Sequence, residues 1–300
     1  MRFTGVRPDG TEIQLGNPRE AMLSFDREAP AMELKAVFAV EKPWDELSEV
    51  LVMQERDGIF RGIVDEQITG LSNEGLTVEL ICRSREALLL DNEAEPGTIR
   101  GPSLEALRRR FLMALGFENI IGQEGAFRGV LNIEKGSSCW RVLSDFCKKN
   151  LMTQPWVSFD RALHCEKETP ERGQISGVIW AELHHLPVKR LSQVYKQGYG
   201  GGYNAMYRDP KALAVRRRYI SAQSGIDPKE LLRIAGEKSF RITVVCKGNL
   251  FNLRRAELEV DLPKAGRFTG CRAERVIYYR DQEGERTKFV LKRGENNVAD

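Results

Sequence analysis

The sequence of 300 residues has few of the features that are typical of metal-binding proteins or of membrane proteins. It has only three histidines, and its six cysteines form no C-x-x-C pair of the kind that zinc sites use. No apolar run approaches the roughly 20 residues that a membrane-spanning helix needs. The first residues, MRFTGVRPDGTEIQL, lack the apolar core of a secretory signal. We therefore expect a chain made in the cytoplasm, with no membrane insertion and with thiols packed as small apolar groups.

Motifs for catalysis and nucleotide binding are missing as well. The patterns G-x-S-x-G, H-E-x-x-H and G-x-x-x-x-G-K-[ST] do not occur. The loop GYGGGY at 198–203 does not open a helix with the spacing G-x-G-x-x-G, so we expect a tight connection there. The sequence predicts no enzyme, no cofactor, no metal site and no catalytic residue.

Two other functions remain open from the residues alone. One is a hydrolase with a Cys–His pair drawn from Cys139, Cys147, Cys165, His164, His184 and His185. Neighbouring residues on a strand point to opposite faces, which disfavours His164 with Cys165. The other is a nucleic-acid-binding module in which Arg216, Arg217 and Arg218 contact phosphates and Tyr219 stacks on a base.

The net charge of +3 hides a gradient along the chain. Residues 1–100 carry a net charge of −9, residues 101–200 carry +4 and residues 201–300 carry +8. A basic last third can meet nucleic acid or the acidic surface of a protein partner. The acidic first third argues against a protein built only to hold DNA.

Strand patterns dominate both ends of the chain. The stretch 57–90, DGIFRGIVDEQITGLSNEGLTVELICRSREALLL, contains a run at 76–81 with nearly period-two apolar spacing. The cluster LSNEG before it is typical of a turn between antiparallel strands. Near the end of the chain, Arg275–Arg280 and Thr287–Lys292 flank the turn DQEGE and predict a further hairpin.

The middle of the chain has helical patterns instead. One helix is expected from Ser103, as N-cap, to Gly116, and a second is expected after Ser138. A hairpin and loop follow at 157–173, and one more short helix is predicted at 228–238. The order is β, then α/β, then β.

Four stretches resemble a known family, the baseplate hub proteins of contractile phage tails (late-control D and XkdQ-like tail proteins). In the stretch that begins at Asp57, Phe60, Gly62, Val64, Leu89 and Leu90 stand where that family has its strand, turn and apolar knot. GSSCWRVLSDFCKKNLM resembles the helix of the family's middle domain. RRRYISAQ and TGCRAERVIYYRDQEGERTKFVLKRG resemble its closing segments.

The resemblance implies an α+β, β-rich fold with two tube-type β-barrel domains and an inserted small α/β region. The first barrel would span 1–91, the insertion 92–173 and the second barrel 174–300. The implied function is that of a structural hub in the virion tail baseplate of a phage, prophage or tailocin. Within it a homotrimeric ring joins the tail tube to the central spike and contacts other baseplate proteins. In this context the hydrolase alternative would be a tail-associated peptidoglycan hydrolase.

The charge gradient adds an expectation to this resemblance. DNA that passes transiently through the ring should slide without binding, because each phosphate contact adds affinity. We therefore expect some of the acidic residues of the first third to line the channel: Asp57, Asp65, Glu66, Glu74 and Glu79. The basic patch Arg216–Arg218 would face outward and contact acidic partners. In isolation we expect only weak self-association, with a stable trimer forming in the host cytoplasm during tail assembly.

Overall fold

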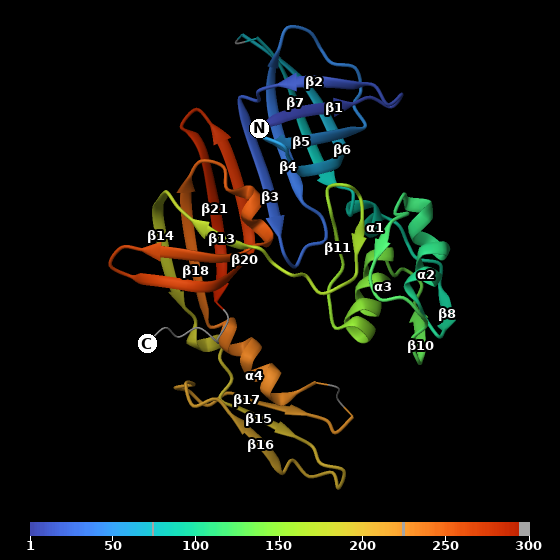
Figure 1. The fold of residues 1–300 in the computed structure, drawn as a ribbon, viewed down its shortest axis with the longest axis vertical. Helices are drawn as coiled ribbons and strands as arrows, with labels where there is room; N and C mark the ends of the chain where they lie inside the picture. The colour runs from blue at the N-terminus through green and yellow to red at the C-terminus, as the bar shows by residue number, and fades with distance from the viewer. Residues whose placement is uncertain (74, 224–225, 294–300) are drawn as a thin grey trace. The chain divides into compact units, whose positions relative to one another are not determined.

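A computed structural model describes residues 1–73, 75–223 and 226–293 and shows a β-rich α+β fold (Figure 1). The fold class predicted from the sequence is confirmed. The chain forms two compact units. The first unit comprises 1–169 with 277–285, and the second comprises 170–276 with the chain from 286 on. The three-part division at 91 and 173 and the closure of the strands into tube-like barrels remain predictions.

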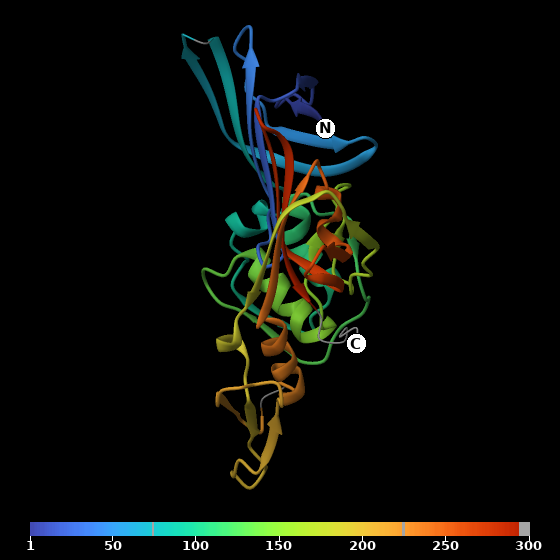
Figure 2. The same ribbon diagram turned by 90° about the vertical axis from the view of Figure 1, so that its left-hand side faces the viewer.

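The first unit is built on an antiparallel sheet with the strand order β3-β4-β7-β6-β5-β1-β2. Its strands are β1 (Arg2–Val6), β2 (Glu12–Gly16), β3 (Glu20–Asp26), β4 (Glu33–Val40), β5 (Glu49–Gln54), β6 (Asp57–Ser72) and β7 (Gly75–Ser84). Strands β6 and β7 form the long hairpin that the stretch 57–90 predicts, drawn in blue-green in Figure 2.

Buried side chains alternate with more exposed ones along β7, and the buried ones form the inner face of this sheet. Val78, Leu80 and Cys82 are buried and lie directly opposite buried residues of β4. Those partners are Phe38, Ala36 and Leu34 respectively. Because directly opposite side chains share a face, the pattern fixes the register: a slip by one residue would turn this apolar row outward.

Two glycines of β6 are required by close approaches. A Cβ atom on Gly62 would lie 2.3 Å from the carbonyl oxygen of Arg83 and 2.4 Å from the ring of Phe60. A Cβ atom on Gly58 would lie 2.2 Å from the ring of Phe159. Gly58 therefore lets the turn that carries Phe159 pack directly on the strand.

The rest of the first unit contains the predicted helices. It comprises α1 (Ala87–Asp91), β8 (Gly97–Arg100), α2 (Leu104–Leu107), β9 (Ile120–Ile121), β10 (Val130–Ile133), α3 (Cys139–Phe146), β11 (Trp156–Val157) and β12 (Leu163–His164). A π-helical turn (Arg108–Leu112) and a 3-10 turn (Met113–Leu115) extend α2, and a second π-helical turn (Cys147–Leu151) extends α3.

The expected N-caps of these helices are confirmed. The Ser103 hydroxyl accepts a hydrogen bond from the amide of Ala106 at 3.1 Å, and the Ser138 hydroxyl accepts one from Arg141 at 3.2 Å. Leu107, Leu143 and Phe146 are fully buried in one shared apolar cluster. That cluster gives this part of the chain its own core.

The second unit has the strand order β14-β18-β21-β20-β19-β13. Its elements are β13 (Arg172–Ile175), β14 (Val178–His185), β15 (Gln193–Lys196), β16 (Ala205–Arg208), β17 (Arg217–Ile220), α4 (Pro228–Glu237), β18 (Phe240–Lys247), β19 (Glu257–Leu262), and most of β20 (Gly266–Asp281) and β21 (Gly284–Arg293). The ends of β20 and β21 within 277–285 belong to the first unit. The closing hairpin and the short helix after Asp227 are confirmed. Across β18 and β21, buried Ile242 and Val244 face buried Leu291 and Phe289.

Among the described residues, no helix combines the length and the apolar character needed to cross a bilayer.

Substitution Gly58→Ala should lower the free energy of unfolding by about 1–3 kcal/mol, the usual range for overpacking. The added methyl group must displace the Phe159 ring or bend β6. Chemical denaturation followed by circular dichroism measures the change. Gly200→Ala is the matched control, because no atom lies within 4 Å of a Cβ placed there. Equal stability of the Gly58→Ala variant and the wild type would contradict the packing described here.

Candidate interaction surface

A small three-stranded sheet in the second unit carries the predicted basic patch. Strand β15 lies in its centre, antiparallel to β16 and parallel to β17. Helix α4 packs on one face, where Val194, Ile220 and Leu232 are buried together. The opposite face of the sheet is therefore the one that is available for contacts.

We call this opposite face the tyrosine face. It contains two rows of side chains that the strand register places directly across from one another: Gln193, Arg208 and Arg217 in one row, and Tyr195, Met206 and Tyr219 in the other. The rings of Tyr195 and Tyr219 stack at 5.0 Å, and Tyr203 meets Tyr219 edge-on at 5.1 Å. Tyr203, Met206 and Tyr219 remain exposed.

Hydrogen bonds fix the polar row of the tyrosine face. The amide oxygen of Gln193 accepts a hydrogen bond from Nε of Arg217 at 2.8 Å and another from the hydroxyl of Tyr195 at 3.2 Å. This holds the Arg217 guanidinium beside the aromatic row. The resulting face combines rigid aromatic rings with positive charge.

The three consecutive arginines do not share one face. Arg217 lies in the row of Gln193, whereas Arg218 pairs in register with buried Val194 and so projects to the other side. Arg216 hydrogen-bonds through its backbone amide to the Ser192 hydroxyl, at 2.8 Å, before the strand begins. Arg208 joins Arg217 on the tyrosine face instead. The sequence contained no signal for Arg208, since the pairing of β15 with β16 decides it.

The acidic residues expected in the channel lie on the β6–β7 hairpin. Asp57 and Glu66 are exposed. Asp65 accepts two hydrogen bonds from Arg83, at 2.7 and 3.0 Å, and Glu79 forms an ion pair with Lys35 at 2.5 Å. Glu74 lies outside the described residues. Basic partners therefore offset the charges of Asp65 and Glu79, and the channel role of all five remains a prediction.

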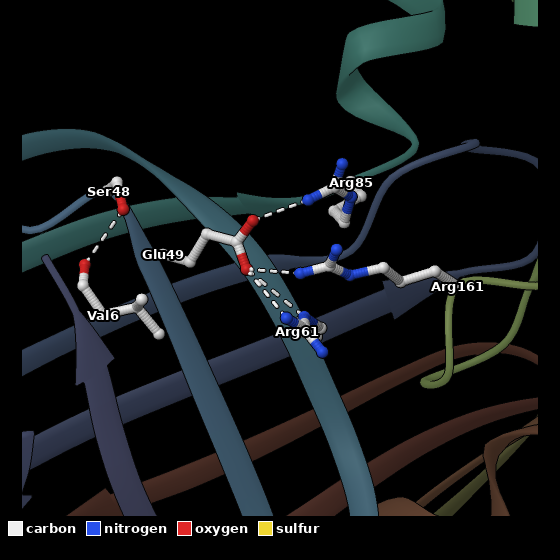
Figure 3. A network of polar contacts seen from close by, with 6 residues as sticks. All are labelled: Val6, Ser48, Glu49, Arg61, Arg85 and Arg161. Carbon is white, nitrogen blue, oxygen red and sulfur yellow. Dashed lines mark hydrogen bonds and ion pairs between the residues drawn. The ribbon is translucent and has the colours of Figure 1, made fainter. Parts of the chain in front are cut away.

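A second polar cluster surrounds Glu49 at the start of β5, and sequence analysis did not find it (Figure 3). One carboxylate oxygen accepts a hydrogen bond from Arg85 at 2.6 Å. The other accepts bonds from Arg61 and Arg161, each at 3.2 Å. The neighbouring Ser48 donates its hydroxyl to the carbonyl of Val6 at 3.0 Å. The residues of the cluster are far apart in the sequence, so no local pattern marks them.

Comparison with known proteins identified relatives only among solved structures. No family model and no curated protein matches the sequence. The 43 kDa tail protein of prophage MuSo2 from Shewanella oneidensis superposes with a TM-score of 0.77 at 13% identity, over 98% of both chains. A tail protein from Neisseria meningitidis gives a TM-score of 0.71 at 16% identity, over 98% of this chain and 97% of the other.

This chain has the fold of prophage tail proteins. A third similar structure is an Escherichia coli component of the type VI secretion system, described as structurally similar to the T4 tail proteins gp27 and gp5. It matches with a TM-score of 0.58 at 10% identity, over 93% of this chain and 74% of that one. The tail-protein fold thus extends over nearly the whole sequence.

In this tail-protein fold all six cysteines are buried free thiols. Burial raises the pKa of Cys246 to about 11, and burial with the nearby charge of Asp65 raises that of Cys82 to about 12. The pKa of Cys165 is raised by its hydrogen bond to Cys147 and by burial. Neutral, enclosed thiols are poor nucleophiles, which disfavours the Cys–His hydrolase.

His164, one of the three histidines considered for that pair, has other partners. Its ring stacks on Trp156 at 3.9 Å, and its Nε2 lies 3.2 Å from the Ser158 hydroxyl. Within the described ranges, no group of three or more His, Cys, Asp or Glu residues is arranged to hold a metal ion.

The native protein should react with a thiol reagent such as DTNB at pH 8 at least about 100-fold more slowly than glutathione does. Reaction requires both exposure and ionisation: all six thiols are buried, and burial raises the pKa of Cys82, Cys139 and Cys246. Absorbance at 412 nm measures the reaction, and guanidinium chloride should release all six thiols. One thiol that reacts within seconds in the native protein would reopen the nucleophile hypothesis.

Proposed function

We propose that this protein is a structural baseplate hub of a contractile tail, in which three copies form a ring between tail tube and central spike. The main support is the similarity to two tail proteins over nearly the full length of each. A further support is the shared fold with a type VI secretion component that is itself described as similar to the T4 tail proteins gp27 and gp5. The proposal includes three parts: that the protein forms a ring, that this ring has three-fold symmetry, and that it adjoins the tail tube and the spike.

The tyrosine face is the surface that we assign to a neighbouring baseplate protein. Tyrosine and arginine are enriched at the centres of protein interfaces, where they combine apolar area with hydrogen bonding. Arg208 and Arg217 make this face basic, so its partner should present carboxylates. Because the sheet and α4 share their own buried core, the tyrosine face keeps its structure when no partner is bound.

The acidic β6–β7 hairpin and the contact with DNA complete the proposal. Asp57 and Glu66 would contribute negative charge to the channel, so that passing DNA is repelled rather than bound. The nucleic-acid-binding alternative places Arg216, Arg217 and Arg218 on one phosphate-contacting surface, but alternation along β17 separates Arg217 from Arg218. The protein would meet DNA only in transit, with no cofactor.

Assembly of tails tests the proposal. We expect deletion of the gene from the phage or prophage that encodes it to abolish complete tails, as seen by negative-stain electron microscopy. The double substitution Arg208→Glu and Arg217→Glu should reduce complete tails by about tenfold, equivalent to roughly 1.4 kcal/mol of lost binding.

Lys229→Glu is the matched control, since Lys229 is an exposed residue of α4 and lies away from the tyrosine face. Circular dichroism of each purified variant checks that it folds. Complete tails in normal numbers after deletion of the gene would refute the hub function. Normal assembly of the double variant alone would refute only the assignment of the tyrosine face.

A further inference from the structure

The cluster around Glu49 contains more positive than negative charge. Three guanidinium groups, from Arg61, Arg85 and Arg161, meet a single carboxylate (Figure 3). Each guanidinium carries several N–H donors, whereas one carboxylate can accept only a few hydrogen bonds. Among the described residues, Glu49 is the one acidic group paired with any of the three. Two positive charges are therefore left without a counter-ion.

This excess charge is largely enclosed. The side chains of Arg85 and Glu49 are only 14% and 16% exposed, and that of Arg61 is 26% exposed. Nε of Arg85 and Nε of Arg161 are buried, and neither has a hydrogen-bond partner within the described part of the chain. Burial lowers the pKa of Arg85, and the charge of Arg161 lowers it further. Enclosed cations with unused donors are unfavourable unless an anion compensates them.

The backbone of Arg161 carries a second cost. This residue has a φ of 70°, in the left-handed region that non-glycine residues rarely adopt. It is held there by the turn that begins at Ser158, whose carbonyl accepts a hydrogen bond from the Arg161 amide at 3.0 Å. Strain of this kind persists where the side chain's position matters. From this turn the Arg161 guanidinium donates a hydrogen bond to Glu49 at 3.2 Å.

We propose that Arg61, Arg85 and Arg161 form a binding site for a small oxyanion of the phosphate or carboxylate class. Guanidinium groups bind such anions through paired N–H donors, and Glu49 holds the three groups together while the site is empty. Arg161, at 37% exposure, is the most accessible of the three. The site lies entirely within the first unit and does not depend on the proposed function.

Thermal unfolding and calorimetry of the full chain test this site. Millimolar inorganic phosphate or acetate, each compared with chloride at equal ionic strength, should raise the melting temperature. Above the Kd, the stabilisation should grow with the logarithm of the anion concentration, as it does for a single binding site. Titration calorimetry at 25 °C should give a stoichiometry of one. An effect of phosphate alone, of acetate alone or of both anions supports an oxyanion site and identifies its preference.

Variants separate binding at this site from a general salt effect. Arg161→Gln should abolish the stabilisation, whereas Arg128→Gln, at an exposed position of the same unit, should leave it intact. Glu49→Gln removes the resident carboxylate, so it should lower the melting temperature without added anion and increase the gain from phosphate. No anion-specific gain in the wild type, or an equal gain in Arg161→Gln, would overturn the proposal. If Glu49→Gln fails to fold, the calorimetry of Arg161→Gln still decides.

Discussion

The contact of one carboxylate with three arginines is the interaction on which the first unit's organisation depends. Glu49 lies on β5, Arg61 on β6 and Arg85 just after β7, whereas Arg161 comes from the turn between β11 and β12. The cluster therefore joins three neighbouring strands of the sheet to a hairpin whose Arg161 lies 112 residues after Glu49. Ion pairs of this kind add little stability at an exposed surface. In a partly enclosed site, however, loss of one partner leaves the charges of the others unpaired, which destabilises the fold.

Packing at Gly58 reinforces the same junction. The ring of Phe159 takes the space that a side chain on Gly58 would fill, and Arg161 follows two residues later in the same turn. One turn thus makes an apolar contact on β6 and an ionic contact on β5. The opposite charges set the position of the turn, and the glycine permits its close approach.

Local patterns predicted much of the fold, because strand alternation and helix caps are properties of neighbouring residues. The β6–β7 hairpin, the caps at Ser103 and Ser138 and the closing hairpin were all found in this way. Pairing between distant strands has no comparable signal. The sequence therefore groups Arg216, Arg217 and Arg218 as one patch, whereas the register places Arg208 and Arg217 on either side of Gln193 on one face and Arg218 on the other face.

The proposed function relies on surfaces rather than on reactive groups. The six thiols are enclosed, whereas the tyrosine face exposes aromatic and basic side chains on a sheet that α4 supports from behind. In the proposal, these side chains recognise another protein through area and charge. The similarity to tail proteins over whole chains shows a shared fold, and the assignment of a partner to the tyrosine face depends on this surface alone.

A cryo-electron microscopy map of purified tails from the encoding phage or prophage tests the central claim most directly. The account predicts three copies of this chain in one ring at the baseplate end of the tube, with the tyrosine face in contact with a neighbouring protein. A tail whose baseplate is complete without this chain, or a map with the chain repeated along the tube, would contradict it.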